Sequence, residues 1–136
     1  MKDIPHRASR AGSTIRILDA GALAQQAPFD LVLCDAPCSG SGAWRRSPEA
    51  KWTFTPQALD ALVEVQQDIL KRAADLTSPS GSLVYATCSV LKAENENAVA
   101  RFLDTHRAWS CRFERRINIS TDGDGFYAAH LTRDII

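Results

Sequence analysis

Apolar and polar positions along the 136-residue chain follow two periods, which predicts a mixture of strands and helices. Residues 14–19 (TIRILD) alternate apolar and polar side chains, a pattern that is typical of a short strand. Residues 29–35 (FDLVLCD) form an apolar run of the kind found in a central strand buried on both faces. Apolar residues then recur at helical spacing up to Leu76, after a Thr55-Pro56 pair that suits a helix start.

The second half of the chain repeats this order. Residues 82–87 (SLVYAT) predict a second core strand, and a second helix is expected over residues 92–106. Two further strands, 112–119 and 126–132, flank a DGDG turn and predict a terminal hairpin. The order of elements argues for an α/β fold whose sheet is parallel in its centre and antiparallel at its C-terminal end.

Composition narrows the class of protein. The chain is 45% hydrophobic and 24% charged, which suits one globular domain over residues 1–136. Sixteen basic and sixteen acidic residues give no net charge, so any RNA binding must be local. The basic opening is expected to be helical, and residues 44–52 to form a loop. Neither a signal peptide nor a membrane span is predicted, and we expect a cytoplasmic protein without a membrane partner.

The chain has four cysteines, which are too few and too scattered for a disulfide scaffold. The spacing of Cys34 and Cys38 differs from a zinc knuckle, and nothing pairs with Cys88 or Cys111, so no metal is expected. Cys34 alternates with Asp35 along its strand and is expected in the core.

Cys38 and Cys88 each follow one of the two central strands in a loop of small residues. Ligands bind outside the carboxyl ends of such strands, so both thiols should face one crevice. Three chemistries are open: a redox dithiol, a cysteine hydrolase, and a thiol nucleophile with a second thiol that handles protons. The redox pair lacks a CxxC motif and the hydrolase lacks an obvious histidine base, which favours the third.

Two motifs then resemble a known family. DAPCSGSG at residues 35–42 resembles motif IV of the Sun-type RNA (cytosine-5) methyltransferases, and ATCSVLKAENE at residues 86–96 resembles their motif VI. RRSPEAKW at 45–52 and DGFYAAHLTR at 124–133 are similar to other family segments. The resemblance implies a Rossmann-like class I methyltransferase sheet, here the C-terminal part of an S-adenosylmethionine-dependent catalytic domain.

The resemblance also implies roles for single residues. Cys88 would attack carbon 6 of cytosine as a thiolate, which makes carbon 5 nucleophilic. Cys38 would assist the elimination that releases the methylated RNA. Asp35 would lie between cofactor and base, Pro37 would fix the direction of the loop, and Asp19 would bind the adenine of the cofactor.

The substrate implied by the resemblance is RNA, ribosomal RNA in particular. Arg45, Arg46 and Lys51 are expected near its phosphates. Trp44 and Trp52 would either stack on bases or pack in the core. Core packing is also expected of Trp109, and the Glu94-Asn95-Glu96 run is favoured as a helix start rather than a catalytic group.

The sequence departs from the family before Asp19. The glycine-rich cofactor loop and the first two strands of the family sheet have no counterpart, and Gly12 cannot replace that loop. The strand that ends at Asp35 would then have an uncovered edge. We expect residues 14–19 to pair with it or another chain to cover it; otherwise the exposed edge favours self-association. A noncatalytic remnant or binding module of the same fold is the alternative function.

Overall fold

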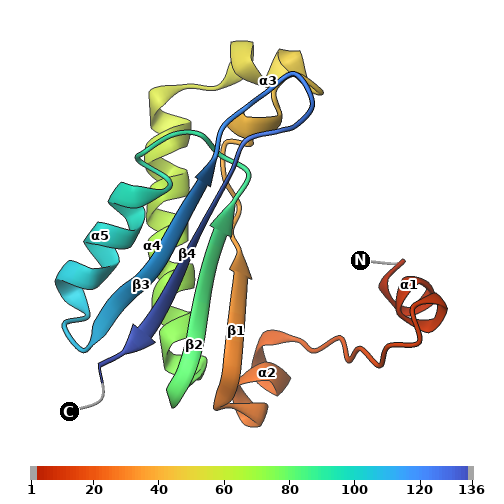
Figure 1. Ribbon diagram of the computed structural model, residues 1–136, viewed down its shortest axis with the longest axis vertical. Helices are drawn as coiled ribbons and strands as arrows, with labels where there is room; N and C mark the ends of the chain where they lie inside the picture. The colour runs from red at the N-terminus through yellow and green to blue at the C-terminus, as the bar shows by residue number, and fades with distance from the viewer. Residues whose placement is uncertain (1–2, 135–136) are drawn as a thin grey trace.

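The computed structural model describes residues 3–134, which form one mixed four-stranded sheet of order β1-β2-β4-β3 (Figure 1). The strands are β1 (Phe29–Asp35), β2 (Thr77–Thr87), β3 (Trp109–Ile117) and β4 (Phe126–Arg133). β1 runs parallel to β2, whereas β4 runs antiparallel to both β2 and β3. The predicted parallel centre and antiparallel terminal hairpin are therefore confirmed.

Helices α4 and α5 lie against one face of this sheet (Figure 1). α4 (Pro56–Leu76) has the predicted bounds. The side chain of Thr55 caps it by accepting a hydrogen bond from Ala58 N at 3.2 Å, which satisfies a backbone donor at the helix start. α5 (Glu96–Thr105) is shorter than predicted because residues 92–95 form a turn.

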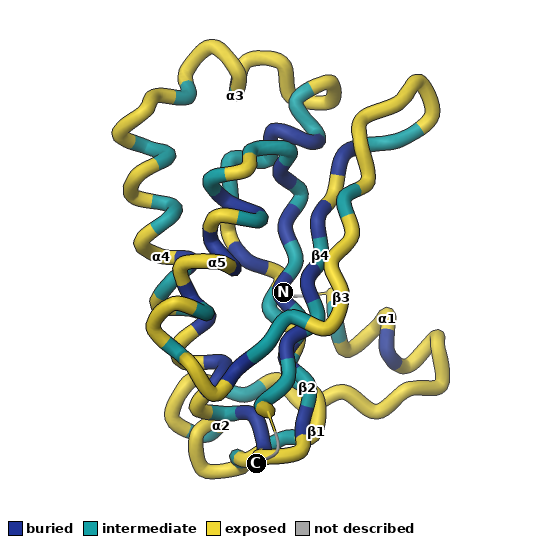
Figure 2. Tube along the Cα trace, turned by 60° about the vertical axis from the view of Figure 1, so that its left-hand side comes forward, coloured by how far each residue is buried: buried dark blue, intermediate teal, exposed yellow. Residues whose placement is uncertain are grey.

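The hydrophobic core fills the space between the sheet and these two helices. Figure 2 shows buried residues in β2 and β4 and on the inner sides of α4 and α5. The largest buried apolar side chains are Leu70, Leu83, Tyr85, Phe102, Tyr127 and Leu131. Trp109 also joins this cluster, so the core packing expected of it is confirmed. Burial of each such side chain contributes about 1.5–3 kcal/mol to folding.

β1 differs from its prediction. It was expected to be buried on both faces, but it forms the edge of the sheet, and Leu31 and Leu33 are 63% and 66% exposed. Val32 and Cys34, which point to the other face, pack against the core. The apolar run predicts two covered faces, yet within residues 3–134 only one face and one edge of β1 are covered.

The prediction of a strand at residues 14–19 is wrong. These residues belong to no strand, and residues 11–17 are exposed (Figure 2). Asp19 instead begins α2 (Ala20–Gln26) as its N-cap. The expected pairing of this segment with β1 therefore does not form, and the outer edge of β1 stays unpaired within residues 3–134. The helical opening is confirmed as α1 (Ile4–Arg10).

The stretch predicted as a loop at 44–52 contains a short helix. η1 (Ser41–Ala43) is a 3₁₀ turn, and α3 (Pro48–Thr53) follows it. Both precede α4 and lie at the end of the sheet where β1 and β2 finish (Figure 1). Among the described helices, none combines the length and apolar character that crossing a bilayer requires.

Candidate active site

The two cysteine loops leave neighbouring parallel strands at the same end of the sheet. Asp35, the last residue of β1, pairs with β2 one residue before that strand ends. The Sγ atoms of Cys38 and Cys88 lie 3.5 Å apart, which confirms that the two thiols come together. We call residues 36–42 the first thiol loop and residues 88–91 the second thiol loop.

Backbone hydrogen bonds fasten the first thiol loop to the second and to the terminal hairpin. Ala36 N donates to Ala86 O, and Gly42 N donates to Cys88 O, both at 2.9 Å. Gly125 N, in the turn before β4, donates to Gly42 O at 2.9 Å. A Cβ atom at Gly42 would overlap the Gly125 carbonyl and lie 2.8 Å from Cys88 O, so the close approach requires glycine.

A fully buried carboxylate, Glu94, joins the two thiol loops. Its oxygens accept hydrogen bonds from Ser39 N at 2.7 Å and from the hydroxyls of Ser39 and Ser89. Gln66 Nε2, from the middle of α4, donates to the same carboxylate at 3.1 Å. These donors offset the cost of removing a carboxylate from water and fix both loops relative to α4.

Asn95, the residue after Glu94, holds the second thiol loop through its side-chain amide. Thr87 Oγ1 donates to Asn95 Oδ1 at 2.6 Å, and Asn95 Nδ2 donates to Ser89 O at 2.9 Å. Glu96 begins α5 and is bound by Arg116, whose Nε lies 2.9 Å from Glu96 Oε1. The helix start that the sequence favours for this run holds for Glu96, whereas Glu94 and Asn95 precede the helix and bind the thiol loops.

Burial makes Cys38 a weak acid. It raises the pKa of the Cys38 thiol to about 12, a backbone hydrogen bond with Gly40 opposes the shift, and the neighbouring Cys88 thiol adds to it. The raised pKa favours the neutral thiol of Cys38 at pH 7, which can donate its S–H proton in a hydrogen bond. Burial likewise raises the pKa of Cys34 to about 11, which agrees with its expected place at the core.

Asp35 and Pro37 flank the start of the first thiol loop. Asp35 is exposed and lines a cavity of about 250 Å³ on the open face of the sheet, together with Ala86 and Phe126. Pro37 is exposed as well, and its carbonyl oxygen accepts a hydrogen bond from Gln66 Nε2 at 3.0 Å. This bond ties the first thiol loop to α4.

The three cations predicted to meet RNA follow the first thiol loop. Arg45 Nε and Arg46 Nη2 each lie 2.7 Å from an oxygen of Asp124, in the turn before β4. The hydrogen bond from Arg45 contributes most to holding the pKa of Asp124 below its ordinary value. Lys51 lies on α3, with Nζ 5.7 Å from the ring centroid of Trp52. Of these three cations, Arg45 and Arg46 are thus paired with Asp124.

Asp19 does not join Asp35. Its Oδ1 atom accepts a hydrogen bond from Ala22 N at 2.8 Å, which caps α2. The next residue, Ala20, lines a cavity of about 470 Å³ between α2, β1 and α4, and Asp35 lines the different cavity described above. The structure brings Cys38 and Cys88 together but not the two acids.

Sequence reasoning missed the buried polar contacts that hold the thiols. Ser39 and Ser89 each directly follow a cysteine, and this repeated Cys-Ser pair is a signal that could have linked them. Gln66 lies on the otherwise apolar face of a predicted helix, where a polar side chain needs a buried partner. The distance of Glu94 from the first thiol loop in sequence hid their contact.

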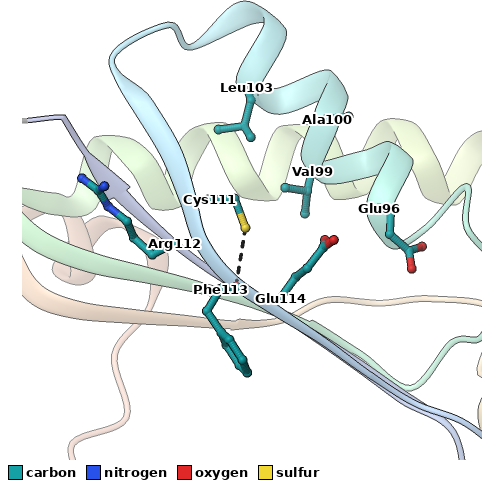
Figure 3. Close-up of a pocket in the computed structure, with 8 residues that line it drawn as sticks. All are labelled: Glu96, Val99, Ala100, Leu103, Cys111, Arg112, Phe113 and Glu114. Atoms are coloured by element: carbon teal, nitrogen blue, oxygen red, sulfur yellow. Dashed lines mark hydrogen bonds between the residues drawn. The ribbon is translucent and has the colours of Figure 1, made fainter.

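Cys111 lies away from the thiol pair, on β3. It lines a pocket of about 410 Å³ between α5 and β3, and its Sγ lies 3.5 Å from Phe113 O (Figure 3). Among residues 3–134, no three His, Cys, Asp or Glu side chains are grouped as ligands for a metal ion.

Comparison with known proteins identifies the family. A family model described as 16S rRNA methyltransferase RsmB/F matches residues 8–132, which is nearly all of the chain. The chain belongs to this family. Its thiol loops are therefore those of an RNA methyltransferase family, and the Sun-type resemblance is confirmed.

Relatives of this RsmB/F-family chain support the assignment. It is 44% identical to the probable ribosomal RNA small subunit methyltransferase B of Synechocystis sp. over 76% of its length. It is 37% identical to the ribosomal RNA small subunit methyltransferase B of Photorhabdus laumondii over 81% of its length. These matches cover 27% and 28% of the relatives, so the chain spans about a quarter of their length.

The fold is shared with solved structures. The crystal structure of NSun6 from Pyrococcus horikoshii with SFG has a TM-score of 0.78 to this RsmB/F-family chain, at 21% identity. The match covers 97% of this chain and 38% of that one. The sheet and its helices therefore share the fold of a part of that larger structure.

Proposed function

We propose that this chain carries the catalytic residues for methylation of carbon 5 of cytosine in ribosomal RNA. The contact between Cys38 Sγ and Cys88 Sγ, at 3.5 Å and at the carboxyl ends of two parallel strands, carries the proposal. Carbon 5 of cytosine is a weak nucleophile, and addition of a thiolate to carbon 6 removes that obstacle. Ribosomal RNA as substrate would also imply a cytoplasmic location.

Cys88 is the proposed nucleophile. Its thiolate would form a bond to carbon 6, and the electron pair of the 5,6 double bond would move to carbon 5 and, by conjugation, to nitrogen 3 of the ring. Carbon 5 would then take the methyl group of S-adenosylmethionine, which leaves as S-adenosylhomocysteine. A general base would remove the carbon 5 proton, which restores the double bond and expels the Cys88 thiolate. Asp35 would hydrogen-bond the edge of the base as charge develops on the ring.

Cys38 is the proposed partner in that elimination. Because burial raises its pKa to about 12, the neutral thiol is favoured, and its S–H can donate a hydrogen bond to the Cys88 sulfur as that sulfur leaves carbon 6 as a thiolate. Its hydrogen-bonding distance from Cys88 supports this role. Loss of Cys38 should therefore slow release of the RNA more than formation of the covalent bond.

S-adenosylmethionine is the methyl donor that this chemistry requires. Residues 3–134 do not form a complete site for this donor. Asp35 lines one cavity, whereas Asp19 adjoins a different one. Asp19 Oδ1 also already accepts the hydrogen bond that caps α2. Asp35, Pro37 and the second oxygen of Asp19 remain the proposed contacts. The other contacts would come from outside this chain.

Arg45, Arg46 and Lys51 are the proposed contacts to RNA phosphates. Both arginines now share Asp124, and both remain largely exposed, with 45% and 67% of their side-chain surfaces accessible. A phosphate oxygen could replace Asp124 as the hydrogen-bond acceptor. This exchange would release the turn before β4 when RNA binds.

Two variants test the proposal with a transcript of small-subunit ribosomal RNA and S-adenosylmethionine. Cys88→Ala should abolish the covalent adduct seen on a denaturing gel, and Cys38→Ala should let that adduct accumulate. An adduct formed by Cys88→Ala would overturn the assignment of the nucleophile. Calorimetric titration with S-adenosylmethionine shows beforehand whether the chain binds the methyl donor by itself.

A noncatalytic remnant or binding module is the second candidate. The uncovered edge of β1 and the short span relative to the known family members favour it. In that case calorimetry would detect no S-adenosylmethionine binding, and neither methyl transfer nor an adduct would appear. The thiol chemistry would then belong to a longer protein.

A further inference from the structure

Trp52 is the most exposed large apolar side chain among the described residues, with 82% of its surface accessible. The two other tryptophans differ, because Trp109 is buried in the core and Trp44 is half-buried. Core packing, one of the two alternatives expected for Trp52, is therefore wrong. The exposed ring is accessible to a ligand, and covering it would bury apolar surface.

Trp52 lines a cavity of about 560 Å³ beside the thiol loops. The cavity also contains Trp44, Arg45, Lys51, Val90 and Ile119. Val90 belongs to the second thiol loop, and its N donates to Ser41 Oγ of the first thiol loop at 2.9 Å. The cavity thus opens next to the two cysteines and is walled by aromatic, apolar and cationic side chains.

The two tryptophans that line the cavity differ in how they are held: Trp44 is fixed by contacts, whereas Trp52 is exposed and can contact a ligand. Trp44 Nε1 donates to Ser39 O at 3.0 Å, and the Trp44 ring packs against Phe54 with centroids 5.8 Å apart. Trp52 lies on α3, and the Lys51 ammonium is 5.7 Å from the centroid of its ring. A planar group of a ligand could therefore stack on the Trp52 ring while a negatively charged group of the same ligand contacts Lys51 and Arg45.

We propose that Trp52 is the stacking platform for an unpaired RNA base next to the target cytosine. The inference rests on the function proposed above and adds to it a second nucleotide subsite. A nucleotide suits this cavity better than a protein segment, because the cations around the ring complement a phosphate and the ring complements a base. A single-stranded or looped RNA is therefore the substrate class that this site selects.

Binding of a short single-stranded, cytosine-containing RNA labelled at one end tests the subsite by fluorescence anisotropy. Trp52→Ala should weaken binding about tenfold, since a base stacked on an aromatic side chain is worth that much or more. Trp52→Phe should retain most of the affinity because it keeps an aromatic face. Val65→Ala is the control, because Val65 is another exposed large apolar residue, 45% accessible, that lies on α4.

Affinity that Trp52→Ala leaves unchanged would overturn the inference, and so would the absence of saturable RNA binding by the unaltered chain. If Trp52→Ala changes the oligomeric mass but not RNA binding, the ring serves a protein contact instead. The two proposals fail separately. If RNA binding depends on Trp52 but no covalent adduct forms, only the catalytic proposal is contradicted. If the adduct forms equally well with Trp52→Ala and RNA affinity is unchanged, only the subsite is contradicted.

Discussion

At the scale of single residues, Cys38 has the most altered chemistry among the thiols. Its pKa of about 12 in the folded chain lies above the ordinary value of 9.0 because the thiol is buried. The folded state therefore holds this proton more tightly than the unfolded state. The resulting stabilisation is complete below about pH 9 and is lost as the pH rises towards 12.

Alkylation of Cys38 by iodoacetamide should follow this shift. The rate depends on the thiolate fraction, so its midpoint should lie near pH 12 in the folded chain and near pH 9 in urea. Mass spectrometry of the peptide that contains Cys38 gives the rate at each pH. Equal midpoints in the folded and urea-treated chains would contradict the assigned environment.

The sequence was informative about the reactive residues and less so about those that hold them. Cys38 and Cys88 could be brought together because each ends a strand of a parallel pair. The partnership of Glu94 with Ser39 could not be predicted, because it joins positions 55 residues apart through a turn that no periodic pattern describes.

At the scale of elements, the turn before α5 connects both thiol loops. Glu94→Ala would leave the Ser39 and Ser89 hydroxyls and the Ser39 backbone amide without their acceptor in a buried place. Each such loss costs about 1–3 kcal/mol, so the free energy of unfolding should fall by about 3 kcal/mol or more. Urea unfolding followed by circular dichroism measures the change.

Glu64→Ala is the matched control for this variant. Glu64 pairs with Arg101 across the surfaces of α4 and α5, and both side chains are at least half exposed. Water screens such a pair, so the urea midpoint should scarcely move. If both glutamate variants shift the midpoint equally, the buried network does not stabilise the thiol loops.

The elements differ in how far local sequence determines them. α4 could be predicted to the residue because an N-cap, a first-turn proline and a long apolar stripe all agree. Residues 14–19 have only an alternating pattern, which specifies an apolar face but cannot supply a neighbouring strand. α5 begins later than expected because Glu94 and Asn95 are held by side-chain contacts with the thiol loops.

At the scale of the whole molecule, residues 3–134 leave one face of the sheet uncovered. The strand register places Leu33, Val84, His130 and Phe113 in one row on the face opposite α4 and α5. Ile117 and Phe126 extend this apolar surface and are also exposed. Such a surface beside an unpaired edge strand favours association with another copy or another part of the protein.

We therefore expect the isolated chain to self-associate through β1. Light scattering should give a mass above that of the monomer, and the mass should rise with concentration. Leu33→Lys places a charge on the edge strand and should restore the monomer. Val65→Lys is the control, because Val65 is an exposed apolar residue on α4 and its replacement should leave association intact. A monomeric unaltered chain would contradict this expectation.

The close approach of Gly42 and Gly125 has a consequence for the order of assembly during synthesis. The chain leaves the ribosome from its amino end, so both cysteines emerge before the turn that contains Gly125. The backbone hydrogen bond between the two glycines cannot form until the terminal hairpin has folded. The pocket that holds the thiols is therefore completed last, and a nascent chain that still lacks the hairpin carries both reactive groups without their final support.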